Sequence, residues 1–273
     1  VHPGGWQESR ITRCGRTLAE ETTAEASAWT SIEAARRIHE QGGRDNLYVK
    51  IPGTPAGVPA IEESIFAGVP INVTLLFSTT QYLAVAEAYM RGIERRLEAG
   101  LSPSVESVAS LFVSRWDKAS AGQLPAELHN RLGIAVAQQA YRAYRELLAS
   151  ERWKKLAAAG ARPQRMLWAS TGTKDPAAPD TLYIEALAAP DTINTIPEKT
   201  LRAFADHGKV RGAMADDGGD FADTLGKIAA AGVDIDALAD QLQRDGADAF
   251  VKSWKQLMQR IADKAQALAG GDR

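Results

Sequence analysis

Apolar and polar residues follow two rhythms along this chain, and together they predict an α/β fold. Short apolar runs that read as strands alternate with segments in which apolar residues recur every three or four positions, as in helices. Five strands are predicted, a short one that ends on Lys50 and four at 69–77, 105–113, 165–169 and 191–196. Helices are predicted at 18–39, 56–67, 79–99, 125–156, 181–187, 197–207, 220–231, 234–244 and 246–268. This alternation favours a parallel sheet with right-handed crossovers.

The number of strands leaves the architecture open. A closed (β/α)8 barrel needs about eight strands, whereas an open doubly wound sheet can use about five or six. The run at 69–77 is apolar nearly throughout, which is typical of a parallel strand covered on both faces. Neither a GxGxxG nor a Walker pattern occurs, which disfavours a nucleotide-binding sheet.

Composition narrows the possible functions. The net charge of the 273 residues is −2, so there is no electrostatic case for binding nucleic acid or an anionic membrane. No apolar run approaches the length of about 18 residues that a membrane span needs, and no secretory signal is visible, so we expect a cytoplasmic protein. Cys14 is the only cysteine and the four histidines are scattered, so we expect no internal disulfide and no metal site. Whether the chain forms a homo-oligomer is left open.

Lys50 is the first candidate for chemistry. It ends a strand among Tyr48, Val49 and Ile51, and a Pro/Gly-rich turn follows at once. An amine placed where water is scarce can act as a nucleophile and form a Schiff base with a carbonyl substrate. The alternative is an ordinary solvated charge at the end of a strand.

Polar residues recur on one face of each predicted strand near its C-terminal end, where the active sites of barrels lie. They are Lys50 in the first strand, Asn72 and Thr74 in the second, Ser110 beside Val108 and Phe112 in the third, Ser170 with Trp168 in the fourth, and Thr192 and Asn194 in the fifth. A shared polar pocket is therefore predicted. The alternative is that backbone hydrogen bonds satisfy each side chain separately.

Two cations follow strands at positions that suit an anion. Arg115 comes directly after the third strand, and Lys174 lies in a Ser/Thr/Gly-rich turn after the fourth. Backbone N–H groups, hydroxyls and a cation in such a loop suit a phosphate. The alternatives are a solvated loop with a surface cation and, for Arg115, an ion pair with Asp117.

Taken in order, the segments NLYVKIPGTPAG, INVTLLFS, SVASLFVSRWD, LWASTG and DTINTIPEKT resemble the successive strands of transaldolases, with the spacing of the longer bacterial members. The similarity begins near residue 17, so the chain divides into a non-matching segment, 1–16, and a partial barrel domain, 17–273, that includes the C-terminal helices. The resemblance implies a (β/α)8 TIM barrel of class I aldolase type, incomplete here with about five strands visible. The C-terminal helices, with Phe250, Trp254 and Leu257 on one face, are expected to pack on it.

The resemblance also implies roles for the candidate residues, without a metal or cofactor. Lys50 matches the Schiff-base lysine, and Asn72 and Thr74 match the pair that holds substrate hydroxyls and the catalytic water. The positions that would shape the pocket and hold the phosphate are Ser110, Phe112, Arg115, Ser170 and Lys174. Lys50 must lose its proton to attack a ketone, and desolvation and cations such as Arg115 favour the uncharged amine.

The implied reaction transfers a dihydroxyacetone unit from sedoheptulose 7-phosphate to glyceraldehyde 3-phosphate, in the pentose phosphate pathway. Two alternatives remain: a class I aldolase that cleaves a ketose phosphate without transfer, and a non-catalytic partial chain that still binds sugar phosphates.

The N-terminal part departs from the family pattern. The family's first-strand aspartate has no counterpart, and the glutamate expected in the third strand falls near Ile11 or Thr12. We therefore expect a truncated barrel with a scrambled third-strand region. Such a barrel would have unpaired sheet edges, and we expect poor binding or turnover from this chain.

Overall fold

A five-stranded parallel sheet forms the centre of the molecule, in the order β1-β2-β3-β4-β5. The structure, a computed structural model, describes residues 28–44 and 46–270. The strands are β1 (Val49–Pro52), β2 (Ile71–Leu76), β3 (Ser107–Phe112), β4 (Gln164–Ala169) and β5 (Thr192–Asn194). The predicted α/β class, with its parallel strands, is confirmed. Within the described residues β1 and β5 are the two edges, so the sheet is open.

Helices connect the successive strands, as a parallel sheet requires. They are α2 (Ala28–Gly42), α3 (Gly57–Phe66), α4 (Thr79–Glu98), α5 (Ser114–Ser120), the 3-10 turn η1 (Ala126–Leu128), α6 (Leu132–Ala149), α7 (Glu151–Ala158), α8 (Leu182–Ala186), α9 (Glu198–His207), α10 (Phe221–Ala230) and α11 (Ile235–Gly270). Among the described residues, no helix combines the length and apolar character needed to cross a membrane. The long N-terminal helix predicted from residue 18 is described only from Ala28 onward.

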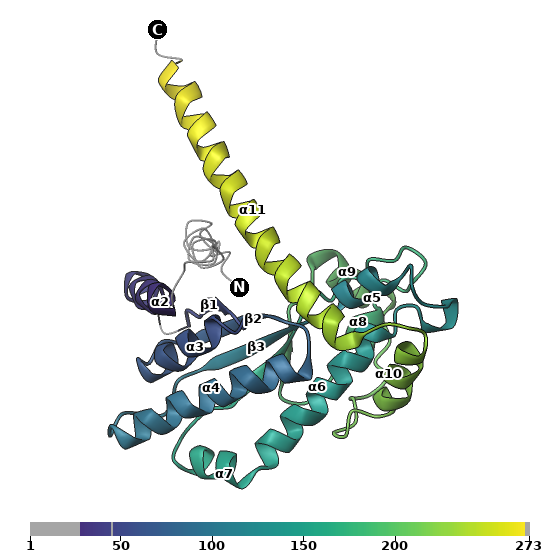
Figure 1. The fold of residues 1–273 in the computed structure, drawn as a ribbon, viewed down its shortest axis with the longest axis horizontal. Coiled ribbons are helices and arrows are strands. Elements are labelled where there is room, and N and C mark those ends of the chain that lie inside the picture. The colour runs from purple at the N-terminus through teal and green to yellow at the C-terminus, as the bar shows by residue number, and fades with distance from the viewer. Residues whose placement is uncertain (1–27, 45, 271–273) are drawn as a thin grey trace.

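One face of the sheet, here called the outer face, packs against α3, α4 and α6 (Figure 1). Its core takes alternate strand residues, including Ile51, Val73, Ala109 and Met166. The large fully buried rings of Tyr82, Tyr89, Tyr141 and Tyr144 fill the space beneath the helices. Because this layer carries most of the apolar area removed from water, it is the principal hydrophobic stabilisation of the fold.

The opposite face, here called the inner face, carries the alternate set of strand residues. Val108, Phe112 and Leu167 on this face join one cluster with Ile228 of the α10 region and Leu242 of α11. The first turns of α11 therefore lie over this face, while the rest of the helix runs away from the sheet (Figure 1). The inner face is the one on which Lys50 and Asn72 lie side by side in the sheet register.

A β-bulge interrupts β2 near its C-terminal end. The register of β2 on β3 shifts between Val73 and Leu76, and Leu75 has a left-handed φ of 61°. A positive φ is rare for leucine and costs free energy unless packing enforces it. Leu75 is fully buried in the inner-face cluster, and this burial compensates for the strain.

Three parts of the chain differ from the sequence prediction. The single helix predicted at 125–156 is divided into η1, α6 and α7. The segment after β3, left unassigned in the sequence prediction, is the short helix α5, and α11 continues through Gly246 where two separate helices were predicted. No proline interrupts α11, and Gly246 is buried where the helix approaches β2. In the sequence, a glycine that allows a helix to pack closely looks the same as a glycine that ends a helix.

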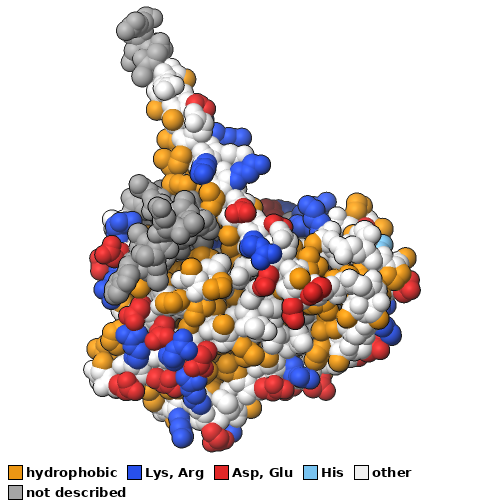
Figure 2. Space-filling view, in the orientation of Figure 1, with side chains coloured by type: hydrophobic (Ala, Val, Ile, Leu, Met, Phe, Trp, Pro, Cys, Tyr) orange, Lys and Arg blue, Asp and Glu red, His pale blue; other side chains and the backbone are white. Residues whose placement is uncertain are grey.

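The packing expected for the C-terminal helices is confirmed only for their first part. Phe250 packs against the inner-face cluster. Beyond it most side chains of α11 are exposed, and Leu257 and Ile261 are 37% and 49% exposed. Figure 2 shows the apolar side chains along this projecting end of the helix.

Candidate functional site

Lys50 lies on the inner face of the sheet, in the edge strand β1. Its Cα is in register with Asn72 of β2, and its side chain is half-buried. The ammonium nitrogen lies 5.7 Å from the centre of the Phe250 ring, which comes from α11. The lysine is therefore held between a strand end and a helix rather than extending freely into solvent.

Asn72 and Ser110 form a polar pair beside Lys50. The Ser110 hydroxyl donates a 2.7 Å hydrogen bond to Oδ1 of Asn72. Ser110 is 2% exposed, whereas Asn72 is half-buried and next to Lys50 in the sheet. The bond fixes the Asn72 carbonyl toward Ser110, so the amide NH2 is the group left to face a ligand.

Thr74 is buried next to the bulge. It is 0% exposed, and among the described residues its hydroxyl has no hydrogen-bond partner. A buried hydroxyl without a partner is uncommon and costs free energy. A water or substrate hydroxyl bound here would satisfy it.

A cationic pocket lies beyond the C-terminal ends of β3 and β4. Its volume is about 510 Å³, and its lining residues are Arg115, Lys118, Ala119, Ser170, Lys174 and Leu242. It thus brings together three of the residues predicted to hold a phosphate, from segments after two different strands. None of its three cations forms an ion pair within the part of the chain that the structure describes. Such a set of unneutralised charges suits an anionic ligand.

Arg115 is the most buried of these cations. Its guanidinium lies 4.9 Å from the centre of the Phe112 ring. The centres of the Phe112 and Phe77 rings are 5.4 Å apart. Burial lowers the pKa of Arg115 below its usual value, but arginine stays charged at any physiological pH. The Phe112 side chain therefore positions a partly desolvated cation at the edge of the sheet.

Ser170 reaches the pocket through a left-handed turn. Its φ is 58°, and its hydroxyl lies 3.0 Å from that of Ser114. The backbone N–H of Ser114 donates to the Ser170 carbonyl at 3.1 Å, which extends the pairing of β3 and β4 by one step. The turn breaks the normal alternation of side chains, so Ser170 faces the pocket and not the outer face.

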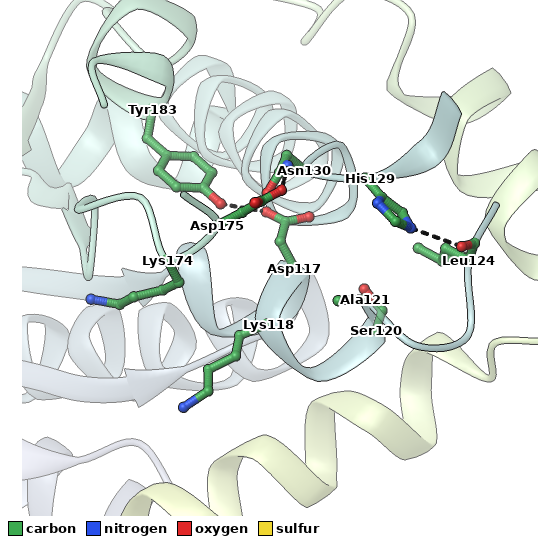
Figure 3. Close-up of a pocket in the computed structure, with 10 residues that line it drawn as sticks. All are labelled: Asp117, Lys118, Ser120, Ala121, Leu124, His129, Asn130, Lys174, Asp175 and Tyr183. Atoms are coloured by element: carbon green, nitrogen blue, oxygen red, sulfur yellow. Dashed lines mark hydrogen bonds between the residues drawn. The ribbon is translucent and has the colours of Figure 1, made fainter. Parts of the chain in front are cut away.

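Asp117 does not pair with Arg115, and that alternative is wrong. Oδ2 of Asp117 accepts a 2.7 Å hydrogen bond from the Tyr183 hydroxyl (Figure 3). Its Oδ1 accepts from the backbone N–H of Gly133 at 3.2 Å. Burial raises the pKa of this carboxyl. Asp117 is 6% exposed and ties α5 to α6 and α8.

Figure 3 also shows that Lys118 and Lys174 extend to the same side, away from the contact between Asp117 and Tyr183. The small pocket drawn there has a volume of about 200 Å³ and shares these two lysines with the cationic pocket. Both lysines therefore line the cationic pocket as well. The phosphate contact predicted for Lys174 stays a prediction.

The predicted polar face is wrong for the two last strands. Trp168 packs on the outer face against Tyr141, with ring centres 6.5 Å apart. In β5 it is Ile193 that joins the inner-face cluster, so Thr192 and Asn194 point the other way. Asn194 accepts a 2.8 Å hydrogen bond from the Thr171 hydroxyl. The polar inner face is thus confined to β1, β2 and β3.

Three contributors to the site were missed in the sequence. Lys118 is one helical turn after Arg115, and this spacing would have shown a shared face had α5 been assigned. Gln243 and Phe250 come from α11, far along the chain, and nothing in their local sequence connects them with Lys50.

The structure offers little for a metal. Among the described residues, no group of three or more His, Cys, Asp or Glu side chains is arranged to hold an ion.

Comparisons with known proteins show which family this chain resembles. The family model described as transaldolase/fructose-6-phosphate aldolase matches residues 15–261. The chain is 45% identical over 256 residues to a transaldolase of Frankia alni. The matched region covers 90% of this chain and 66% of that protein. It is 44% identical to a transaldolase of Renibacterium salmoninarum and 39% identical to transaldolase 2 of Nostoc punctiforme. It covers 68% and 70% of those two proteins, so the chain spans about two thirds of the length of these relatives.

Proposed function

Because the chain belongs to the transaldolase/fructose-6-phosphate aldolase family, we propose that it transfers a dihydroxyacetone unit between sugar phosphates through a Schiff base on Lys50. The donor would be sedoheptulose 7-phosphate and the acceptor glyceraldehyde 3-phosphate, as in the pentose phosphate pathway. No metal or cofactor takes part in this proposal.

The observation that carries the proposal is the placement of an amine and a cationic pocket at one end of one sheet. Lys50, Asn72 and Ser110 occupy the inner face of three adjacent strands, and Arg115 and Ser170 follow the ends of β3 and β4. Neighbouring strands are about 4.8 Å apart, so Lys50 and Ser110 lie about 10 Å apart across the sheet. In this proposal the sugar lies with its carbonyl at Lys50 and its phosphate at Arg115, Lys118 and Lys174.

The chemistry follows from the residues present. The uncharged amine of Lys50 attacks the C2 carbonyl of the donor, and loss of water leaves a protonated imine. When the C4 hydroxyl gives up its proton, the C3–C4 bond breaks, its electrons pass to the imine nitrogen, and an aldehyde leaves. The three-carbon enamine then attacks the acceptor aldehyde, and water releases the product from Lys50.

The inner-face polar groups have specific tasks in this scheme. The amide of Asn72 binds a substrate hydroxyl, while the buried Thr74 hydroxyl orients the water that carries protons. Ser110 holds Asn72 in place, and Phe112 shapes the pocket floor beside Arg115. The cations after β3 and β4 bind the phosphate and so fix which carbonyl faces the lysine.

Trapping of the imine tests the proposal. Borohydride added with fructose 6-phosphate should fix a three-carbon or six-carbon adduct on the peptide that contains Lys50, as read by mass spectrometry. Lys50→Met should abolish the adduct, while Lys154→Met, which changes an exposed lysine of α7, should leave it intact. An adduct spread over several lysines, or none at all, would refute the assignment.

A binding function without transfer is the second candidate. It is favoured by the open sheet of the described residues. Protection of the cationic pocket by phosphate without any trapped imine would support it. Release of free glyceraldehyde 3-phosphate from fructose 6-phosphate without an acceptor would instead indicate a cleaving aldolase.

A further inference from the structure

The first half of α11 forms a wall over the candidate lysine. Gln243, Gly246 and Phe250 follow one another at intervals of three and four, so they share one face of the helix. This face meets the ends of β1 and β2: the ring of Phe250 lies 5.7 Å from the Lys50 nitrogen. Phe250 thus contacts the group on which the proposed reaction depends.

Gln243 anchors this wall to both strands. Its buried side-chain amide donates hydrogen bonds to the Gly53 carbonyl at 3.1 Å and to the Leu75 carbonyl at 3.0 Å. Gly53 lies directly after β1, and Leu75 is the bulge residue of β2. Both donors of one amide are therefore used to set the helix at a fixed height above the strand that carries Lys50.

Gly246 lets the helix approach closely. A Cβ at this position would lie 2.7 Å from Leu75 and 3.3 Å from the guanidinium of Arg115. The same helical face therefore contacts the phosphate-binding cation and, one turn later, the amine. Phe250 cannot shift without a movement that Gln243 and Gly246 resist.

We propose that Phe250 stabilises positive charge on the Lys50 nitrogen, both as ammonium and as the protonated imine. Stabilisation of the protonated imine rests on the proposed Schiff base, whereas stabilisation of the ammonium does not. The face of an aromatic ring carries negative potential, and a cation within about 6 Å of its centre is attracted to it, more strongly where water is scarce. The protonated imine keeps its charge on the same nitrogen, so the ring favours the intermediate that accepts electrons from the breaking bond.

Two measurements on the intact chain test this proposal. Competitive acetylation at pH 7 measures how often the Lys50 amine is uncharged, and it requires no sugar chemistry. Borohydride trapping with subsaturating fructose 6-phosphate, at a pH high enough for the Lys50 amine to start uncharged, measures the protonated imine, because the nitrogen then gains its charge when the imine forms. In Phe250→Leu we expect acetylation of Lys50 to be about three- to tenfold faster and the trapped adduct to fall by a similar factor.

Two further variants control for loosened packing. Phe250→Trp keeps an aromatic face and should retain wild-type values in both measurements. Trp254→Leu removes an aromatic ring one turn further along the same helix and should change neither. Helix content by circular dichroism should be equal in all four proteins.

The outcomes separate this inference from the proposed function. If Phe250→Leu matches the wild type, or shifts both measurements in the same direction, the inference is wrong, because only a charge effect raises one and lowers the other. If the wild type gives no adduct, the Schiff-base proposal fails. The acetylation arm then decides alone: faster labelling in Phe250→Leu but not in Phe250→Trp supports the inference, and any other result overturns it.

Discussion

The side-chain amide of Gln243 lies 3.0 Å from the carbonyl oxygen of Leu75, a residue 168 positions earlier in the chain. Leu75 is the left-handed residue of the bulge, so its carbonyl has left the regular ladder of β2. A buried carbonyl outside the ladder needs another donor. Gln243 supplies it and at the same time fixes α11 above Lys50.

Gln243→Leu should lower the free energy of unfolding by about 1 to 3 kcal/mol, because two buried carbonyls lose their donor. Urea unfolding followed by fluorescence measures the change. Gln241→Leu, on the exposed side of the same helix, should change stability by about 0.5 kcal/mol at most. Equal losses in the two variants would mean that the amide of Gln243 is not anchored as described.

Gly246→Ala and Gly226→Ala should have opposite effects on stability. In α10 a Cβ at Gly226 meets nothing within 4 Å, so alanine should stabilise the helix by about 1 kcal/mol. In α11 a Cβ at Gly246 would lie 2.7 Å from Leu75, so the helix must move and the gain in propensity is lost. Thermal unfolding of the two variants checks the sign. Stabilisation by both would contradict the close approach of α11 to β2.

The buried carboxyl of Asp117 makes stability depend on pH in a definite direction. Burial raises its pKa above the ordinary value of 3.8, so the folded state binds the proton more tightly than the unfolded state. Its stabilising contribution is therefore complete below about pH 3.8 and is lost as pH rises through the folded-state pKa.

Comparison with Asp117→Asn isolates this effect, because other titrating groups are common to both proteins. The free energy of unfolding of the wild type minus that of the variant should fall as pH rises above about 3.8, as measured by urea unfolding. A difference that grows with pH would show that hydrogen bonds from Tyr183 and Gly133 outweigh burial.

Phosphate affinity should distinguish the cations of the pocket. Arg115→Met should weaken binding of inorganic phosphate by about tenfold or more, because it removes a partly buried, charge-assisted donor. Lys118→Met should weaken it by about two- to fivefold, since that lysine is exposed. Calorimetry at low ionic strength measures both effects.

The control for these substitutions is Lys154→Met, outside the pocket, which should leave phosphate affinity unchanged. Added salt should reduce the effect of Lys118→Met more than that of Arg115→Met, because exposed charges are screened more strongly. Equal effects from all three substitutions would mean that phosphate binding depends only on the net charge of the protein and not on the pocket.

The existence and parallel direction of the described strands could be predicted from the sequence, because each strand is an apolar run and each crossover has helical periodicity, whereas their order followed only from the resemblance to transaldolases. The inner-face placement of Lys50, Asn72 and Ser110 followed from alternation within those runs. Their roles in catalysis remain predictions. The segment 1–16 and the expected glutamate position near Ile11 or Thr12 lie outside the described residues.

Each side-chain placement that was predicted wrongly has a physical cause in the structure. Ser170 was assigned to a face by parity with Trp168, but its left-handed φ of 58° turns it into the pocket while Trp168 stays on the outer face. In β5, a strand of three residues, pairing with β4 puts Ile193 inside. Contacts such as that between Gln243 and Leu75 join distant segments, and no short-range pattern encodes them.

The bulge in β2 changes which residues of that strand reach the helices. Alternation alone would send Leu75 toward α3 and α4 and Leu76 inward, yet Leu76 belongs to the outer-face core and Leu75 and Phe77 to the inner cluster. The extra residue shifts the alternation of side chains between the two faces of the sheet by one position. If the same residues paired without the bulge, every side chain from Leu75 onward would exchange its surroundings, including the Phe77 ring that supports Phe112.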